Sequence, residues 1–134
     1  MRKDIELPSA EGVALAFVPD KDADGKKIWT VGIYNERSTE ITNVIINASG
    51  AGRIKGVEKQ TASIRFLIDA VPGGRFKSFE ILVKDSMELS NTYWVSFFEG
   101  DRLCDKKFVL PPKYLALQKK ELITPLRKSG VVVR

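Results

Sequence analysis

The sequence contains no histidine and only one cysteine, Cys104. Histidine is the usual general base near neutral pH and the commonest metal ligand, so Ser-His-Asp and Cys-His catalysis are excluded. A single cysteine rules out an internal disulfide, and a zinc site would have to consist mostly of carboxylates. Cys104 falls in a strand-like segment, where we expect a buried, inert thiol.

Long apolar runs are missing as well. No window approaches the about 18 apolar residues that a membrane-spanning helix requires, and no stretch near Met1 has the form of a signal peptide. Together with the lack of disulfides, this predicts a cytoplasmic protein without a membrane segment. The net charge of +5, from 22 basic and 17 acidic residues, permits attraction to polyanions without requiring it.

Alternating hydrophobicity is the main pattern that is present. In residues 61–70 the five even-numbered positions are apolar, and every odd-numbered one except Leu67 is polar, which predicts a half-buried strand. In residues 76–84, Phe79, Ile81 and Val83 alternate with polar neighbours and form the expected inward face. Five more segments are rich in the β-branched and aromatic residues of strands, namely 13–18, 28–34, 41–48, 92–98 and 103–110.

Turn signals separate these seven segments. Asp24-Gly25, Pro72-Gly73-Gly74 and Glu99-Gly100-Asp101 supply the glycines that tight turns need. Short strands at such spacing predict an all-β sandwich or barrel, and 134 residues fit one domain.

The C-terminal part of the sequence has a different pattern. Pro111-Pro112 ends the last strand, and good helix formers fill residues 113–123. We therefore expect a β-sandwich over residues 1–112 and a short helix and tail over 113–134. Val131 to Val133 either add an edge strand or fray.

A resemblance to a known fold lies in residues 29–48, WTVGIYNERSTEITNVIINA. One strand ends in Asn35, a polar turn follows, and the next strand opens with Asn43-Val44, which resembles the hairpin of bacterial immunoglobulin-like repeats. Leu89 to Val95 is similar to the approach to a tyrosine corner, in which the hydroxyl of Tyr93 would bond nearby backbone. The whole chain also resembles short, uncharacterised bacterial proteins of unknown function. These resemblances imply an immunoglobulin-like antiparallel β-sandwich of about seven strands, and no particular activity.

One loop opens like a calcium site, with Asp20, Asp22, Asp24 and Gly25. A calcium loop of the EF-hand type needs a bidentate Glu at its twelfth position, which is Val31 here. The three aspartates are therefore weak candidates for metal ligands, and a polar turn in which they bond local backbone is favoured. We predict no cofactor.

Basic residues offer a second candidate site. The segment Gly50 to Gly56 matches no phosphate-loop pattern and is expected to be a flexible connection. The candidate anion contacts are Arg53, Lys55, Arg75 and Lys77. A wider basic face with Lys59 and Arg65 would bind nucleic acid if an aromatic residue served as a stacking platform; the candidates are Tyr34, Tyr93 and Trp94.

No spacing singles out a nucleophile beside a base, or the carboxylate pair that glycosidase-type catalysis uses. Asp85 to Glu88 resembles a capping box and predicts one helical turn between strands. The best-supported function is a non-catalytic module that binds a protein partner or self-associates, through an edge strand and residues 113–126. The alternatives are an anion or nucleic-acid binder and an enzyme with a carboxylate-based site.

Overall fold

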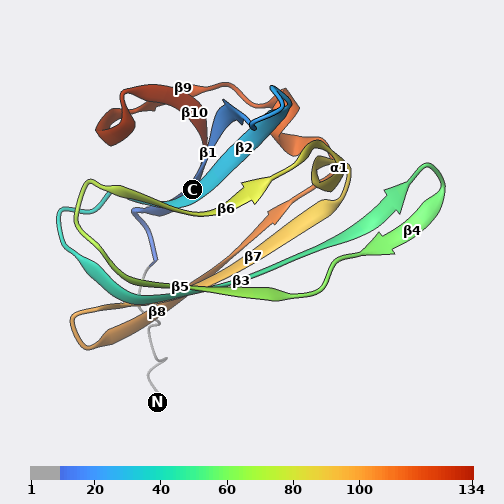
Figure 1. Ribbon diagram of the computed structural model, residues 1–134. Helices are drawn as coiled ribbons and strands as arrows, with labels where there is room; N and C mark the ends of the chain where they lie inside the picture. The colour runs from blue at the N-terminus through green and yellow to red at the C-terminus, as the bar shows by residue number, and fades with distance from the viewer. Residues whose placement is uncertain (1–9) are drawn as a thin grey trace, which may run out of the picture.

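The computed structural model describes residues 10–134, which form two facing antiparallel sheets (Figure 1). The expectation about a signal peptide depends on residues 1–9, which lie outside the described residues. The strands are β1 (Val13–Lys21), β2 (Lys27–Asn35), β3 (Ile41–Ile54), β4 (Val57–Gln60), β5 (Ile64–Val71), β6 (Phe76–Leu82), β7 (Ser90–Glu99), β8 (Arg102–Leu110), β9 (Glu121–Ile123) and β10 (Lys128–Val133). The all-β prediction is thus confirmed.

The strands divide between two sheets. Sheet I has the order β6-β2-β1-β10-β9, and sheet II has the order β4-β3-β7-β8, with β5 also paired to β3. All seven predicted strands are present, β4 and β9 are additional, and the possible strand at Val131 to Val133 is part of β10. The segment Gly50 to Gly56, expected to be a flexible connection, instead continues β3 and turns into β4. Lys55 and Gly56 both have positive φ in that turn, as a tight two-residue hairpin requires.

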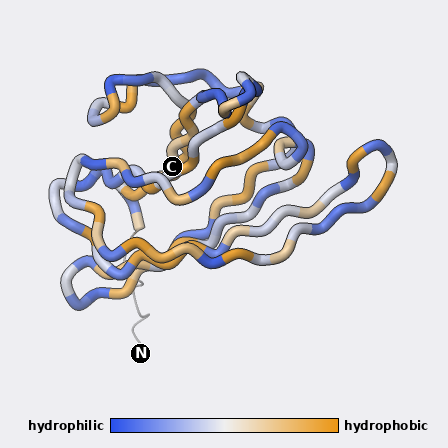
Figure 2. The backbone as a smooth tube through the Cα atoms, viewed as in Figure 1, coloured by the Kyte–Doolittle hydropathy of each residue, from blue (hydrophilic) through white to orange (hydrophobic). Residues whose placement is uncertain are grey.

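The main core lies between the sheets, and hydrophobic stretches run along the strands that enclose it (Figure 2). Phe17 from sheet I meets Tyr93 from sheet II edge to face, with ring centroids 6.0 Å apart. Cys104 belongs to this core and is 3% exposed, as expected for a structural thiol.

The prediction of a C-terminal α-helix is wrong. Residues 113–126 form the 3-10 turn η1 (Tyr114–Leu117), then β9, then the 3-10 turn η2 (Thr124–Leu126). Local helix propensity is a weak preference that tertiary packing overrides. Here Leu115 and Ile123 are buried in two separate clusters, so no single helical face could bury both.

The C-terminal segment instead completes sheet I and covers its outer face. β10 pairs with β1, in the register Leu15 to Val133, and lies between β1 and β9, so it is not an edge strand. Ile123 packs in a second cluster on Ala14 and Ala16, and the segment lies over β1 and β2 in Figure 1. β1 is therefore buried on both faces.

A bulge in β6 changes part of the predicted inward face: Phe79 packs against the core as expected, whereas Ile81 and Val83 are exposed. Val31 pairs with Glu80 and Gly32 pairs with Ser78, so Phe79 is an extra residue. A bulge shifts the alternation of the strand beyond it. As a result Ile81 is 60% exposed, whereas Glu80 is turned toward the interior, where it bonds Tyr93.

A single helical turn, α1 (Lys84–Met87), carries the chain from β6 in sheet I to β7 in sheet II. The prediction of one turn at this crossover is confirmed. The capping box is absent, because the N-cap residue is Val83 and no side chain caps the helix.

Candidate functional site

One polar pair of side chains joins the two sheets across the core. Tyr93 in β7 donates a hydrogen bond of 2.8 Å to Oε2 of Glu80 in β6. Tyr93 is 1% exposed, and its ring lies 6.0 Å from that of Phe79. The tyrosine corner implied by the resemblance is not formed, since this hydroxyl bonds a side chain from the opposite sheet rather than nearby backbone.

Glu80 borders a small cavity of about 130 Å³, which we call the Glu80 pocket. It lies where β3, β6 and β7 meet α1 and the β4–β5 connection. A site for a drug-sized ligand measures about 300–1,000 Å³, so this pocket fits only the end of one side chain or a very small molecule. Its lining comprises Ala48, Ser49, Gly50, Thr61, Ala62, Ile64, Glu80, Leu82, Ser86, Asn91 and Tyr93.

The buried Asn91 lines the Glu80 pocket, and two hydrogen bonds hold its side chain in one orientation. Its amide nitrogen donates to the carbonyls of Ser86 at 2.8 Å and Leu89 at 3.1 Å. Its Oδ1 points toward Gly50, because a Cβ at Gly50 would lie 3.1 Å from that oxygen. Glycine at position 50 therefore keeps the pocket open.

Burial governs the electrostatics of this pair. Desolvation raises the pKa of Glu80 above its ordinary value, and the hydrogen bond from Tyr93 opposes part of that rise. Burial, together with the nearby charge of Glu80, raises the pKa of Tyr93. No lysine or arginine among residues 10–134 forms an ion pair with Glu80. The carboxylate is thus half-buried without a counter-charge.

One carboxylate limits the chemistry of the pocket. The glycosidase-type alternative needs two carboxyl groups about 5–9.5 Å apart, and among the described residues Glu80 is the only acidic one in the pocket lining. Sequence reasoning did not single out Glu80, because only the bulge at Phe79 turns it inward.

A larger groove of about 860 Å³ lies on the other side of α1, beside the β1–β2 hairpin. Its apolar lining comes from Ile28, Trp29, Val83 and Met87. Three lysines and two aspartates share its rim, namely Lys26, Lys27, Lys84, Asp22 and Asp85. These mixed charges specify no ligand class.

The Asp20–Asp24 loop forms the hairpin turn between β1 and β2. The carboxylate of Asp22 accepts hydrogen bonds of 2.9 Å from the backbone N–H groups of Asp24 and Lys26. Asp20 likewise accepts from the N–H of Lys21. This is the local backbone bonding that a polar turn predicts. Within residues 10–134, no three acidic or cysteine side chains group so as to hold a metal.

The candidate anion contacts do not come together. Arg53 and Lys55 belong to the β3–β4 hairpin, whereas Arg75 and Lys77 lie at the start of β6. These segments are at opposite ends of the molecule in Figure 1, so the four residues form no common basic face. Of the three aromatic candidates, Tyr34 and Tyr93 are buried, and only Trp94 is exposed, at 45%.

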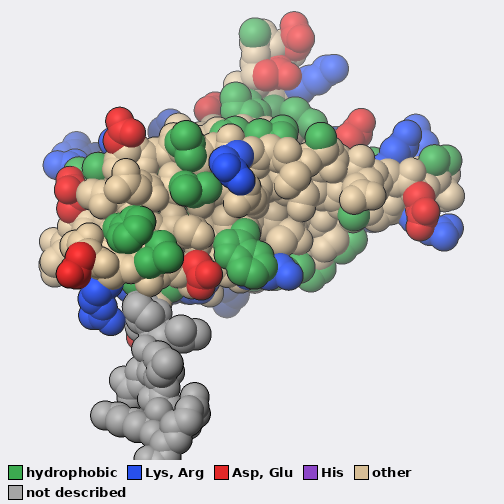
Figure 3. Space-filling view, turned by 90° about the horizontal axis from the view of Figure 1, so that it is seen from below, with side chains coloured by type: hydrophobic (Ala, Val, Ile, Leu, Met, Phe, Trp, Pro, Cys, Tyr) green, Lys and Arg blue, Asp and Glu red, His purple; other side chains and the backbone are tan. Residues whose placement is uncertain are grey.

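Trp94 belongs to the outer face of sheet II, which we call the open face. Figure 3 views this side and shows hydrophobic groups with single charges between them. One row across the sheet runs Arg65, Asn47, Trp94, Lys107, and the next runs Leu67, Ile45, Ser96, Asp105. Lys107 lies over the Trp94 ring, 5.5 Å from its centroid. The apolar members of the open face are Ile45, Leu67, Trp94, Phe98, Leu103 and Val109.

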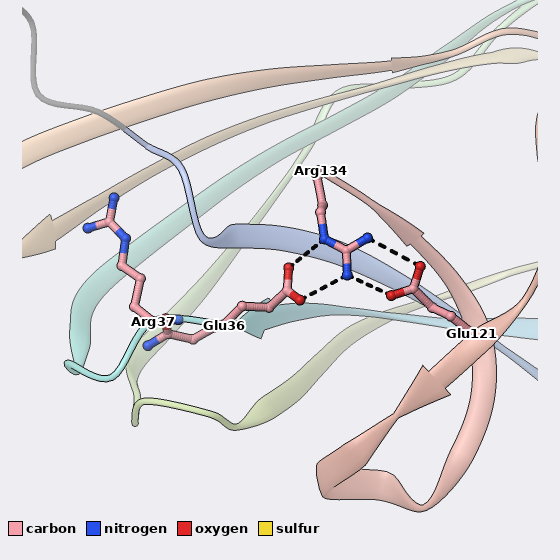
Figure 4. Close-up of polar contacts among 5 residues, drawn as sticks. Glu36, Arg37, Glu121 and Arg134 are labelled. Carbon is pink, nitrogen blue, oxygen red and sulfur yellow. Dashed lines mark hydrogen bonds and ion pairs between the residues drawn. The ribbon is translucent and has the colours of Figure 1, made fainter.

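A polar cluster links the end of the C-terminal segment to sheet I (Figure 4). It consists of Arg134, which follows β10, Glu36, which follows β2, and Glu121 in β9. The guanidinium of Arg134 bonds both carboxylate oxygens of Glu36 at 2.9 Å. It also bonds Glu121, at 2.6 and 3.2 Å. The pairing with Arg134 holds the pKa of Glu121 below its ordinary value. Two-pronged contacts of this kind are stronger than single surface ion pairs.

No helix within residues 10–134 has the length and apolar character to span a bilayer. Comparison with models of protein families, with curated proteins and with solved structures finds no match.

Proposed function

We propose that the protein is a non-catalytic β-sandwich module that self-associates through the open face. The observation that carries this proposal is that no segment within residues 10–134 covers the open face, although apolar side chains such as Leu122 are exposed elsewhere as well. The C-terminal segment covers the outer face of sheet I, while the open face leaves Leu67 71% and Leu103 56% exposed. Leu67 and Leu103 lie on β5 and β8, and Ile45 and Phe98, which are partly exposed, lie on the strands between them. Groups of exposed apolar side chains mark interaction sites.

The fold we infer for this module is immunoglobulin-like. Constant-type immunoglobulin domains place strands A, B and E in one sheet and C, F and G in the other. Here β1, β2 and β6 share sheet I, whereas β3, β7 and β8 share sheet II. The strand order supports the assignment, with β5 added beside β3 as an extra strand is in variable-type domains.

The charges of the open face suit a second copy of the chain. Asp105 and Lys107 lie on the same side of β8 in neighbouring rows. A twofold axis that runs parallel to these two rows and midway between them would set Asp105 of one copy opposite Lys107 of the other. An isologous contact of this kind uses the same patch on both subunits.

The size of the face indicates a weak dimer. Four strands spaced about 4.8 Å apart, each about 30 Å long, give a face of about 600 Å². A standard stable interface buries about 800 Å² per partner. We therefore expect association that depends on concentration in the micromolar range.

Light scattering across a concentration series of about 5–500 µM tests this proposal. The wild-type mass should rise above the monomer mass of 15.0 kDa. Leu67→Arg should remain a monomer, while Leu117→Arg should behave as wild type, since Leu117 is 81% exposed away from the open face. A wild-type mass of 15 kDa throughout would overturn self-association.

A charge exchange tests the geometry of the dimer. Asp105→Lys and Lys107→Asp should each weaken association, because each sets like charges opposite one another. The double exchange should restore it. Failure of the restoration would contradict the proposed axis even if a dimer forms.

One observation favours single-stranded nucleic acid as a second candidate. The exposed Trp94 lies beside Lys107, and Arg65 lies in the same row beyond Asn47, which resembles a stacking platform with basic groups near it. Titration with a thymidine oligonucleotide should then quench tryptophan fluorescence, and the affinity should fall steeply with salt. Unchanged fluorescence would exclude this candidate.

A further inference from the structure

The Glu80 pocket carries a half-buried negative charge, and no cation within residues 10–134 pairs with it. A buried carboxylate without a counter-charge is costly, and a positive group that enters the pocket would offset that cost. Oε2 of Glu80 accepts from Tyr93, and Oε1 bonds no described residue, so it remains available to a ligand.

The other vacant polar groups of the lining can also accept hydrogen bonds. Oδ1 of Asn91 has no donor among the described residues, because the amide nitrogen makes both hydrogen bonds of that side chain. The hydroxyls of Ser86 and Ser49 can accept as well as donate, and no side-chain hydrogen bond occupies either within the described chain. An ammonium group has three donors and no acceptor, which matches this set.

We propose that the Glu80 pocket binds a primary alkylammonium group, as at the end of a lysine side chain. Glu80 supplies the charge, Asn91 and Ser86 supply neutral acceptors, and Leu82 and Ala48 contact the alkyl stem. A cavity of about 130 Å³ has room for such an end and excludes larger ligands. The site lies between the sheets, away from the open face, and does not depend on self-association.

The test uses n-butylammonium chloride as the probe and follows the backbone amide signals of Gly50 and Asn91 by NMR. These signals should shift and saturate for the wild-type protein. The neutral analogue n-butanol, at equal ionic strength, should leave them in place. Shifts of equal size with butanol, or no shifts with butylammonium, would each overturn the proposal.

Two variants test separately the charge of Glu80 and the space that the pocket offers to the ligand. Glu80→Gln keeps the shape of the side chain and should weaken butylammonium binding at least tenfold. Gly50→Ala keeps the charge but places a Cβ in the pocket, 3.1 Å from Asn91 Oδ1, and should also weaken binding. Circular dichroism would verify that both variants fold. Wild-type affinity in a folded Glu80→Gln variant would contradict the assignment.

A peptide series identifies the source of the ammonium group. A short peptide with one lysine should shift the same amide signals, whereas the same peptide with norleucine should not. If butylammonium binds and the lysine peptide does not, the pocket takes a free amine rather than a protein side chain.

Discussion

The hydroxyl of Tyr93 donates a hydrogen bond of 2.8 Å to the carboxylate of Glu80, across the space between the two sheets. Few polar contacts cross the core, where most side chains are apolar. The bond therefore fixes β6 against β7 at one defined position.

Replacing Tyr93 by Phe should destabilise the protein, because Glu80 would lose the one side-chain hydrogen bond that it makes within residues 10–134. A hydrogen bond to a charged group contributes about 1.5–3 kcal/mol. Since Glu80 is only partly buried, we expect a loss of about 1 kcal/mol in the free energy of unfolding. Urea unfolding measures it. Tyr34→Phe is the matched control, because Tyr34 is buried and no described residue bonds its hydroxyl. Equal losses in the two variants would contradict the role of the bond.

Glu80 should also give the stability a pH dependence. Its folded pKa lies above the ordinary value of 4.5, so its contribution is full below about pH 4.5 and is lost as the pH rises through the folded pKa. The pKa of Glu121 is shifted the opposite way, so Glu80→Gln serves as the reference that isolates Glu80.

Urea unfolding of wild type and Glu80→Gln from about pH 3.5 to about pH 8 measures this contribution. The free energy of unfolding of wild type, minus that of the variant, should fall as the pH rises. A difference that stays constant, or that rises, would exclude the predicted sign.

Replacing Asn35 should lower the free energy of unfolding more than most other substitutions of polar residues. It is fully buried, and its amide donates to the carbonyls of Thr39 at 2.8 Å and Val71 at 3.0 Å. Its Oδ1 accepts from the N–H of Arg37. Asn35→Ala leaves these backbone groups without partners, and we expect a loss of about 3 kcal/mol. In Asn47→Ala, the control, one bond of 3.3 Å to Arg65 is lost, and the loss should be below about 0.5 kcal/mol. Thermal unfolding compares the two.

Ile123 tests whether the C-terminal segment is part of the folded unit. Ile123 is fully buried against sheet I, whereas its neighbour Leu122 in the same strand is 61% exposed. Ile123→Ala should therefore cost about 2–5 kcal/mol, and Leu122→Ala should cost less than about 0.5 kcal/mol. Unfolding in urea should remain a single transition in both. A separate early transition would show that the segment unfolds independently.

Much of the fold could be predicted from residue patterns, because alternation and turn glycines are local signals. The segments 28–34 and 41–48 became strands for this reason. The bulge at Phe79 could not be predicted, since an extra residue leaves the alternation of Phe79, Ile81 and Val83 intact in the sequence. Glu80 and its pocket were missed with it.

The wrong prediction of a C-terminal α-helix has a different cause. Residues 113–123 have strong helix propensity, but helix propensity is a local property and does not depend on which elements pack against the segment. The sequence did contain one indication that another segment covers the outer face of sheet I. Residues 13–18 are a continuous apolar run, and such a run is typical of a strand buried on both faces, so something had to lie outside sheet I.

The pairing of β1 with β10 also bears on how long the folded state lasts. Leu15 and Val133 come from distant parts of the chain. A contact of this separation repays its loop-closure entropy only once other parts of the fold are in place, so we expect it to form late in folding. Interactions that form after the folding barrier chiefly control the unfolding rate. Weakening β10 should therefore shorten the lifetime of the native protein while leaving the speed of folding almost unchanged.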